Sequence, residues 1–275
     1  MTLELEDIHP PQPRARFWAR FAPPNDAMRV FRWAWIGLMI GWYCKVSFFF
    51  DDFVGHRVYP MSHPSFEGWR ADARVMWLLY TLPALASFGL LNMTRVRLLV
   101  ASCVGLVCSA GLLLHVSVFN DATFTTSFWV CVWLTWLGWN CQRRDIELVY
   151  ESRRLAMMIV SLMFLGGFMG KLTPEFWSGE MFFNYFFLDR DILHYPWLRE
   201  NLEVQQLREV ATWFSRGVVV MEGVLAAMWI FKFRNVAPFM IVVMACMTAG
   251  STPWLLSVFG CLMAMLAANY AWYDE

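Results

Sequence analysis

The chain has 275 residues, of which 59% are hydrophobic, 17% aromatic and only 16% charged, whereas an ordinary globular domain is roughly 45 to 50% apolar and about 25% charged. This composition excludes an ordinary water-soluble domain, because so much apolar surface needs an apolar solvent. The formal net charge is zero, so electrostatics give no basis for binding nucleic acid.

Residues 1–26 are predicted to form a cytoplasmic tail. The tail contains an extended HPPQP linker at 9–13 and several arginines interleaved with Phe17, Trp18 and Phe21. Two interpretations of this basic segment remain open, namely a short amphipathic helix on anionic headgroups or a solvated tail. We expect no cleavable signal peptide, since these residues lack an apolar stretch.

From residue 27 to 275 the sequence predicts a single all-α transmembrane domain. Unbroken apolar runs of about 20 residues are typical of helices that cross a bilayer, and their lack of alternation excludes a β-barrel. About eight spans are predicted, at 29–49, 75–92, 97–119, 124–139, 155–170, 209–231, 237–251 and 253–270. Alternatively, 237–270 forms one hairpin with a re-entrant turn at Thr252-Pro253, because proline breaks a continuing helix.

Basic residues predict the orientation of this bundle, since lysine and arginine in short loops stay on the cytoplasmic side. With both termini in the cytoplasm, the long connections 50–74 and 171–208 face outward, and we expect the cytoplasmic membrane of a bacterium. The basic residues that then lie inside are Arg14, Arg16, Arg20, Arg29, Arg32, Arg95, Arg97, Arg143, Arg144, Arg153, Arg154, Lys232 and Arg234.

Motifs of common soluble enzymes are missing from the sequence. We find no GxGxxG, P-loop, GxSxG or HExxH motif. The seven cysteines show no CxxC or Cys/His spacing, so they are interpreted as small core residues, and no metal site is predicted.

Ionisable residues within predicted spans are costly and are therefore candidates for function. Lys45 and Arg216 lie near span ends, where a long side chain can extend to the headgroups. His115 is interpreted as a hydrogen-bonded interface residue. Glu222 falls near the middle of its span, so it must face the bundle interior and either hold a proton or meet a partner; a structural clamp and a binding role both remain open.

A short outer turn, FNDATF, joins the third and fourth predicted spans. Its Asn120 and Asp121 are typical of a turn followed by a helix cap. They stay under consideration for a site because the predicted topology places them at the same outer level as Lys171.

The segment GGFMGKLTPEFW, which begins at residue 166, ends the fifth predicted span with glycines and a lysine. Gly166, Gly167 and Gly170 let a helix or a ligand approach the backbone closely. An ammonium at the mouth of a pocket there loses part of its preference for the charged form, so Lys171 is a candidate general base. Without a pocket it is a boundary lysine.

GKLTPEFWSGEMF resembles a stretch of the vitamin K-dependent gamma-glutamyl carboxylase-like family, the horizontally transferred transmembrane domain family. RVFRWAWIGLMIGW is similar to the family's opening span, FNDATF occupies the place of its asparagine-bearing turn, and Glu222 in VVVMEGVLAAMWIF matches an intramembrane acidic position. The resemblance covers most of residues 27–270.

The resemblance implies that Lys171 is the base that deprotonates a reduced quinone of the vitamin K type. It also implies that Glu222, Asn120, Asp121 and Trp177 orient or bind this cofactor. The chain departs from the family at two positions, because Ala122 and Ala245 stand where the family has histidines.

Two functions therefore remain open from the sequence. One is a carboxylase-like or quinol-linked enzyme in which Lys171 acts as the base. The other is a non-catalytic subunit or accessory factor for maturation, export or immunity, which contacts a partner membrane protein or exported protein. The aromatic outer segments, FFNYFF at 182–187 and HYPW at 194–197, are interpreted as exposed patches of the kind that anchors at an interface or a membrane surface, and they favour the second function. A transporter fits less well, because inverted halves and broken helices are not evident.

Overall fold

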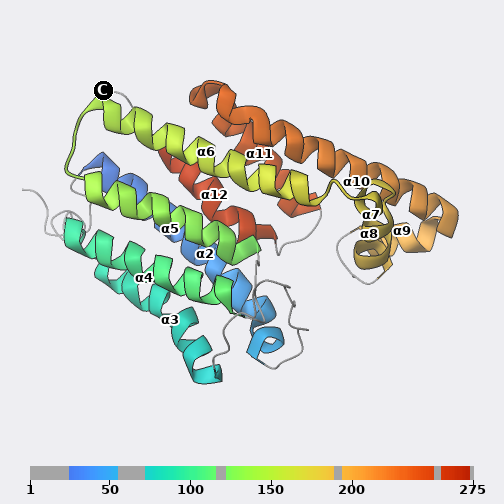
Figure 1. The fold of residues 1–275 in the computed structure, drawn as a ribbon, viewed down its shortest axis with the longest axis horizontal. Coiled ribbons are helices and arrows are strands. Elements are labelled where there is room, and N and C mark those ends of the chain that lie inside the picture. The colour runs from blue at the N-terminus through green and yellow to red at the C-terminus, as the bar shows by residue number, and fades with distance from the viewer. Residues whose placement is uncertain (1–24, 55–71, 116–121, 189–193, 251–254, 273–275) are drawn as a thin grey trace, which may run out of the picture.

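The computed structural model describes residues 25–54, 72–115, 122–188, 194–250 and 255–272, and these residues form helices without any strand. The helices lie roughly side by side along the long axis of the molecule (Figure 1). This arrangement confirms the predicted all-α fold class for the part of the chain that the structure describes.

Long helices coincide with each of the eight predicted spans. They are α2 (Asp26–Val54), α3 (Ala73–Gly89), α4 (Arg95–Leu114), α5 (Ala122–Asn140), α6 (Ile146–Gly170), α10 (Val204–Ala227), α11 (Phe233–Gly250) and α12 (Leu255–Tyr270). A short 3₁₀ turn, η2 (Met228–Ile230), follows α10.

Four of these helices are long and apolar enough to cross a membrane: α4, α6, α10 together with η2 (Val204–Ile230), and α11. Helix α12 is apolar but shorter, with 16 residues. The structure therefore supports a membrane protein by helix length and composition. Eight membrane crossings and a cytoplasmic location of both termini stay predictions.

Polar caps explain why two helices begin earlier than predicted. Asp145 accepts a hydrogen bond from the backbone N–H of Leu148, so α6 begins at Ile146 and not at 155. Glu203 and Gln206 form a capping box that starts α10 at Val204 and not at 209. Such caps satisfy the unpaired amides of a first turn and extend a helix beyond its apolar part.

The contact between α2 and α12 is the most extensive one between helices and depends on small residues. A Cβ atom added to Gly37 would lie 2.1 Å from the Cβ of Ala264, and one added to Gly41 would lie 3.1 Å from the carbonyl oxygen of Ser257. The Gly37 and Gly41 pair forms the small-xxx-small pattern that brings helix backbones together in membranes.

The predicted outer connection 171–208 is folded over most of its described length. It contains α7 (Pro174–Trp177), α8 (Glu180–Phe182), a π-helical turn η1 (Phe183–Leu188) and α9 (Tyr195–Asn201), all beside the first half of α10 (Figure 1).

The predicted exposure of the aromatic outer segments is wrong for four of their phenylalanine and tyrosine residues. Phe182, Phe183, Phe187 and Tyr195 are buried in a small hydrophobic cluster with Leu207 and Ala211 of α10. The sequence interpretation missed this because it treated the segment as a loop without a helix to pack against. Trp197 fits the expectation, with 61% of its surface exposed, and so do the exposed Asn184 and His194.

Several sequence predictions fall outside the described residues. These are the amphipathic tail within 1–24, the turn residues Asn120 and Asp121, and the Thr252-Pro253 turn.

Candidate functional site

Lys171 lies at the C-terminal end of α6 and is the C-cap residue of this helix. Its backbone N–H donates to the carbonyl oxygens of Gly167 and Phe168, each at 3.1 Å. Its side chain turns back along the helix, so that Nζ lies 3.5 Å from the carbonyl oxygen of Gly167. A cation is stabilised in this position, because the last carbonyl groups of a helix carry partial negative charge.

Glu222 of α10 is the partner of Lys171. The lysine Nζ donates to Oε2 of Glu222 at 2.8 Å and to Oε1 at 2.9 Å. Only 8% of the Glu222 side chain is exposed, against 25% of the Lys171 side chain. The carboxylate is thus the inner member of an ion pair, and the ammonium is the member that a ligand can reach.

Gly167 makes this geometry possible. A Cβ atom at this position would lie 3.0 Å from Oε2 and 3.2 Å from Oε1 of Glu222, so a larger residue would displace the carboxylate. The predicted close approach occurs at Gly167 and not at its neighbours, since the space beside Gly166 and Gly170 is open to 4 Å. These two exposed glycines leave the helix surface next to Lys171 without side chains.

The aromatic residue beside Lys171 is Phe176 of α7, whose ring centroid lies 5.8 Å from Nζ. Thr173 caps α7 by accepting a hydrogen bond from the Phe176 N–H, and Pro174 supplies the preset backbone angle of a first helical turn. The site therefore combines an ion pair with an apolar wall.

Three consecutive carbonyl groups fasten α7 to α10. The hydroxyl of Ser215 donates to the Phe176 carbonyl, Arg216 Nε donates to the Trp177 carbonyl at 3.1 Å, and Thr212 Oγ1 donates to the Ser178 carbonyl at 2.7 Å. We call this set the α7 clamp. These hydrogen bonds fix the position of Phe176 along α10, the helix that carries Glu222.

Trp177 does not contact the ion pair. Its side chain is 47% exposed, and the Arg216 guanidinium lies 5.5 Å from its ring and 5.9 Å from the ring of Trp213. Arg216 thus contacts α7, and the extension of its side chain to the headgroups stays a prediction. Lys45 does not extend outward as expected, because it is 6% exposed and lies 5.9 Å from the Phe124 ring.

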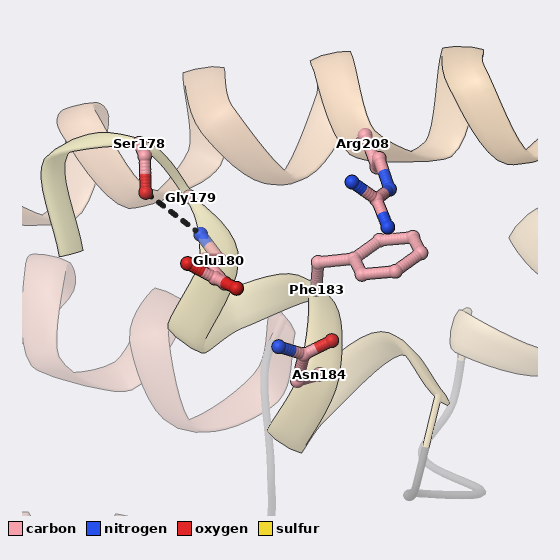
Figure 2. A pocket seen from close by; sticks show the side chains of 6 residues that line it. All are labelled: Ser178, Gly179, Glu180, Phe183, Asn184 and Arg208. Carbon is pink, nitrogen blue, oxygen red and sulfur yellow. Dashed lines mark hydrogen bonds between the residues drawn. The ribbon is translucent and has the colours of Figure 1, made fainter. Parts of the chain in front are cut away.

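A cavity of about 210 Å³ lies between the segment that follows α7 and the first half of α10, and it begins at Ser178 of the α7 clamp (Figure 2). Its lining residues are Ser178, Gly179, Glu180, Phe183, Asn184 and Arg208. Lys171 and Glu222 do not line it, so the cavity and the ion pair are two separate features. Because proton transfer needs an acceptor and a donor in contact, the candidate functional site is the ion pair, and the cavity is considered by itself below.

Sequence reasoning singled out Lys171 and Glu222 separately but missed Phe176, the α7 clamp and the residues of the cavity. One signal was present, since TPEFW carries the threonine and proline of a helix start. Among the described residues, histidine, cysteine, aspartate and glutamate form no group that could hold a metal ion.

Comparison with known proteins gives no relative: no family model, no curated protein and no solved structure matches the chain.

Proposed function

We propose that this chain is an integral membrane protein of the carboxylase-like family in which Lys171 and Glu222 accept a proton from a reduced quinone or a lipid-linked hydroxyl. The observation that carries the proposal is the ion pair itself, because it places a carboxylate and a reachable ammonium at the end of an apolar helix. A quinone of the vitamin K type would supply the redox chemistry.

The distances within the pair are those of a charge-assisted hydrogen bond. In this ionised state Lys171 Nζ holds three protons and cannot accept another, so the open proton acceptor of the pair is the Glu222 carboxylate. Lys171 acts as a base by passing one proton to Glu222 and taking another from the ligand hydroxyl. The pair gains one proton and one positive charge, which lies beside the oxygen that lost its proton.

The surroundings of the pair suit an apolar ligand. Phe176 offers an aromatic wall 5.8 Å from Nζ, and exposed Gly166 and Gly170 leave room for a flat molecule against α6. The residues present therefore fit a quinone that approaches from the bilayer.

Mass spectrometry of the lipids that co-purify with the protein tests this proposal. We expect a reduced or oxidised quinone with the wild-type protein and its loss from Lys171→Met and Glu222→Gln. Lys232→Met is the matched control, because Lys232 is an exposed lysine that follows the C-terminal end of α10 and η2, outside the ion pair. Equal quinone content in all four proteins would overturn the proposal.

A second function, a non-catalytic subunit of a membrane complex, is favoured by exposed aromatic residues outside the ion pair. Trp197 of α9 is 61% exposed and Trp213 of α10 is 73% exposed. Such residues anchor proteins at interfaces. Purification in mild detergent distinguishes the two functions, since a stoichiometric protein partner without quinone supports a subunit.

A further inference from the structure

The cavity beside the α7 clamp holds two opposite charges that do not pair with each other. Glu180 of α8 and Arg208 of α10 both line it (Figure 2). Neither side chain forms a salt bridge with any residue within the described part of the chain. A ligand that carries both a positive and a negative group could pair with both of these side chains at once.

Arg208 is held in place for binding an anion. Its guanidinium lies 4.8 Å from the ring centroid of Phe183, which is buried, so a cation–π contact orients it (Figure 2). The flat guanidinium then keeps its N–H groups for a ligand, and this geometry matches the oxygens of a phosphate.

The other lining residues complete a polar site. Glu180 supplies an acceptor for an ammonium group, and the exposed Asn184 supplies an amide. Gly179 gives the wall its shape: its φ of +82° suits glycine, and an added Cβ atom would lie 2.4 Å from the Cα of Thr212. The cavity is therefore part of the packing of α7 and α8 against α10.

The size of the cavity limits the ligand. A volume of about 210 Å³ is several times the roughly 30 Å³ of one water molecule, yet it is below the approximately 300 Å³ at which pockets for drug-sized molecules begin. A small charged head group fits, whereas a nucleotide does not.

The position of the cavity indicates where this ligand comes from. Trp177 and Trp213 are exposed, and their rings lie 5.5 Å and 5.9 Å from the Arg216 guanidinium; exposed tryptophans are typical of the boundary between hydrocarbon and headgroups. Arg208 lies eight residues before Arg216 on α10, which is about 12 Å along the helix. The cavity thus extends from Ser178, the residue after Trp177, toward the start of α10, away from the apolar second half of that helix, and in a bilayer this direction leads to the lipid phosphates and amines.

We propose that this cavity binds a phosphoethanolamine group, with the phosphate on Arg208 and the ammonium on Glu180, either as a lipid headgroup or as the free compound. The site is independent of the Lys171–Glu222 pair. No covalent step is involved.

Native mass spectrometry of the purified full-length chain with phosphatidylethanolamine and phosphatidylcholine of identical acyl chains tests this proposal. We expect phosphatidylethanolamine to bind about tenfold more tightly, because a choline has no N–H to donate to Glu180. Glu180→Gln should remove this preference, and Arg208→Gln should weaken binding of both lipids about tenfold. Arg208→Lys keeps the positive charge but loses the planar guanidinium with its paired N–H donors, so this variant should bind both lipids with intermediate affinity.

Glu175→Gln on α7 and Arg234→Gln near the start of α11 are matched controls, since both side chains are exposed and lie outside the cavity. Displacement of the lipid by free O-phosphoethanolamine would identify the head group alone as the ligand, whereas binding of the intact lipid only would assign the site to the membrane. Equal binding of the two lipids, or binding unchanged by Glu180→Gln and Arg208→Gln, would overturn the proposal.

Discussion

At the scale of single residues, the ion pair between Lys171 and Glu222 is the feature with the largest energetic consequence. Removing one member leaves the other charge beside an apolar wall without a partner, and Glu222 is the more buried of the two. Replacing both removes the two desolvation costs together, so the pair is expected to behave non-additively.

We therefore predict that Lys171→Met lowers the free energy of unfolding by about 2 to 3 kcal/mol, at the low end for a buried pair because Lys171 is partly exposed. The double variant Lys171→Met/Glu222→Leu should recover most of this loss. Unfolding in mixed micelles of the wild type, both single variants and the double variant measures the coupling. Additive losses would mean that the two side chains do not interact.

The sequence singled out Lys171 and Glu222 one by one as unusual residues, but it did not predict their contact. Each residue is unusual where it stands, since an ionisable group in an apolar helix needs a partner. They lie 51 residues apart, and the register between α6 and α10 depends on small residues such as Gly167 and Gly223 that no local pattern specifies. The cavity was not predictable for the same reason, because its two charged residues, Glu180 and Arg208, come from different helices.

At the scale of elements, the α7 clamp connects the end of α6 to α10. Gly179 directly follows the clamp in the chain: its backbone has a φ of +82°, and it lies against Thr212, whose hydroxyl belongs to the clamp. A side chain here meets both a conformational and a steric penalty.

Gly179→Ala is thus predicted to lower stability by about 2 kcal/mol or more and to loosen the cavity. Gly217→Ala is the matched control on α10, since the space beside Gly217 is open to 4 Å, and alanine favours a helix. Thermal unfolding of both variants in detergent provides the comparison. A Gly179→Ala protein as stable as the control would show that the segment adapts without strain.

The beginning of α6 gives a prediction about pH. The backbone N–H of Leu148 and then the side chain of Arg143 hold the pKa of Asp145 below its ordinary value. A lowered pKa in the folded state means that Asp145 stabilises the fold fully above its unfolded pKa, and that this contribution is lost as the pH falls through the folded pKa.

The stability difference between the wild type and Asp145→Asn should accordingly be present at neutral pH and shrink in the acidic range below the ordinary aspartate pKa. Asparagine preserves the cap, so the comparison isolates the charge. Unfolding measured over a series of pH values tests this expectation. A difference independent of pH would rule out a role for the carboxylate charge.

At the scale of the whole molecule, the helix positions followed from the sequence because a bilayer requires unbroken apolar helices. The first residues of α6 and α10 did not follow from the sequence in the same way. Polar caps, and not hydropathy, determine where these two helices begin. The folded segment between α6 and α10 was interpreted as a loop for a related reason: its apolar residues, such as Phe182 and Phe187, gain their burial from α10 and have no periodicity of their own.

The predicted orientation places the cavity and Lys171 outside and the start of α11 inside. Labelling with a membrane-impermeant thiol reagent tests it through two exposed positions, Asn201 of α9 and Arg234 of α11. We expect Asn201→Cys to react in intact cells and Arg234→Cys to react only after the membrane is opened. The reverse pattern would invert the topology.

The central claim is that the Lys171–Glu222 pair takes a proton from a bound hydroxyl. Infrared difference spectroscopy of the purified protein, recorded without oxygen before and after addition of a reduced vitamin K-type quinone, tests it most directly. The account predicts a new carbonyl band from a protonated Glu222 carboxyl group, which is missing in Glu222→Gln and in Lys171→Met. A wild-type spectrum without this band, or a band that persists in Glu222→Gln, would contradict the account.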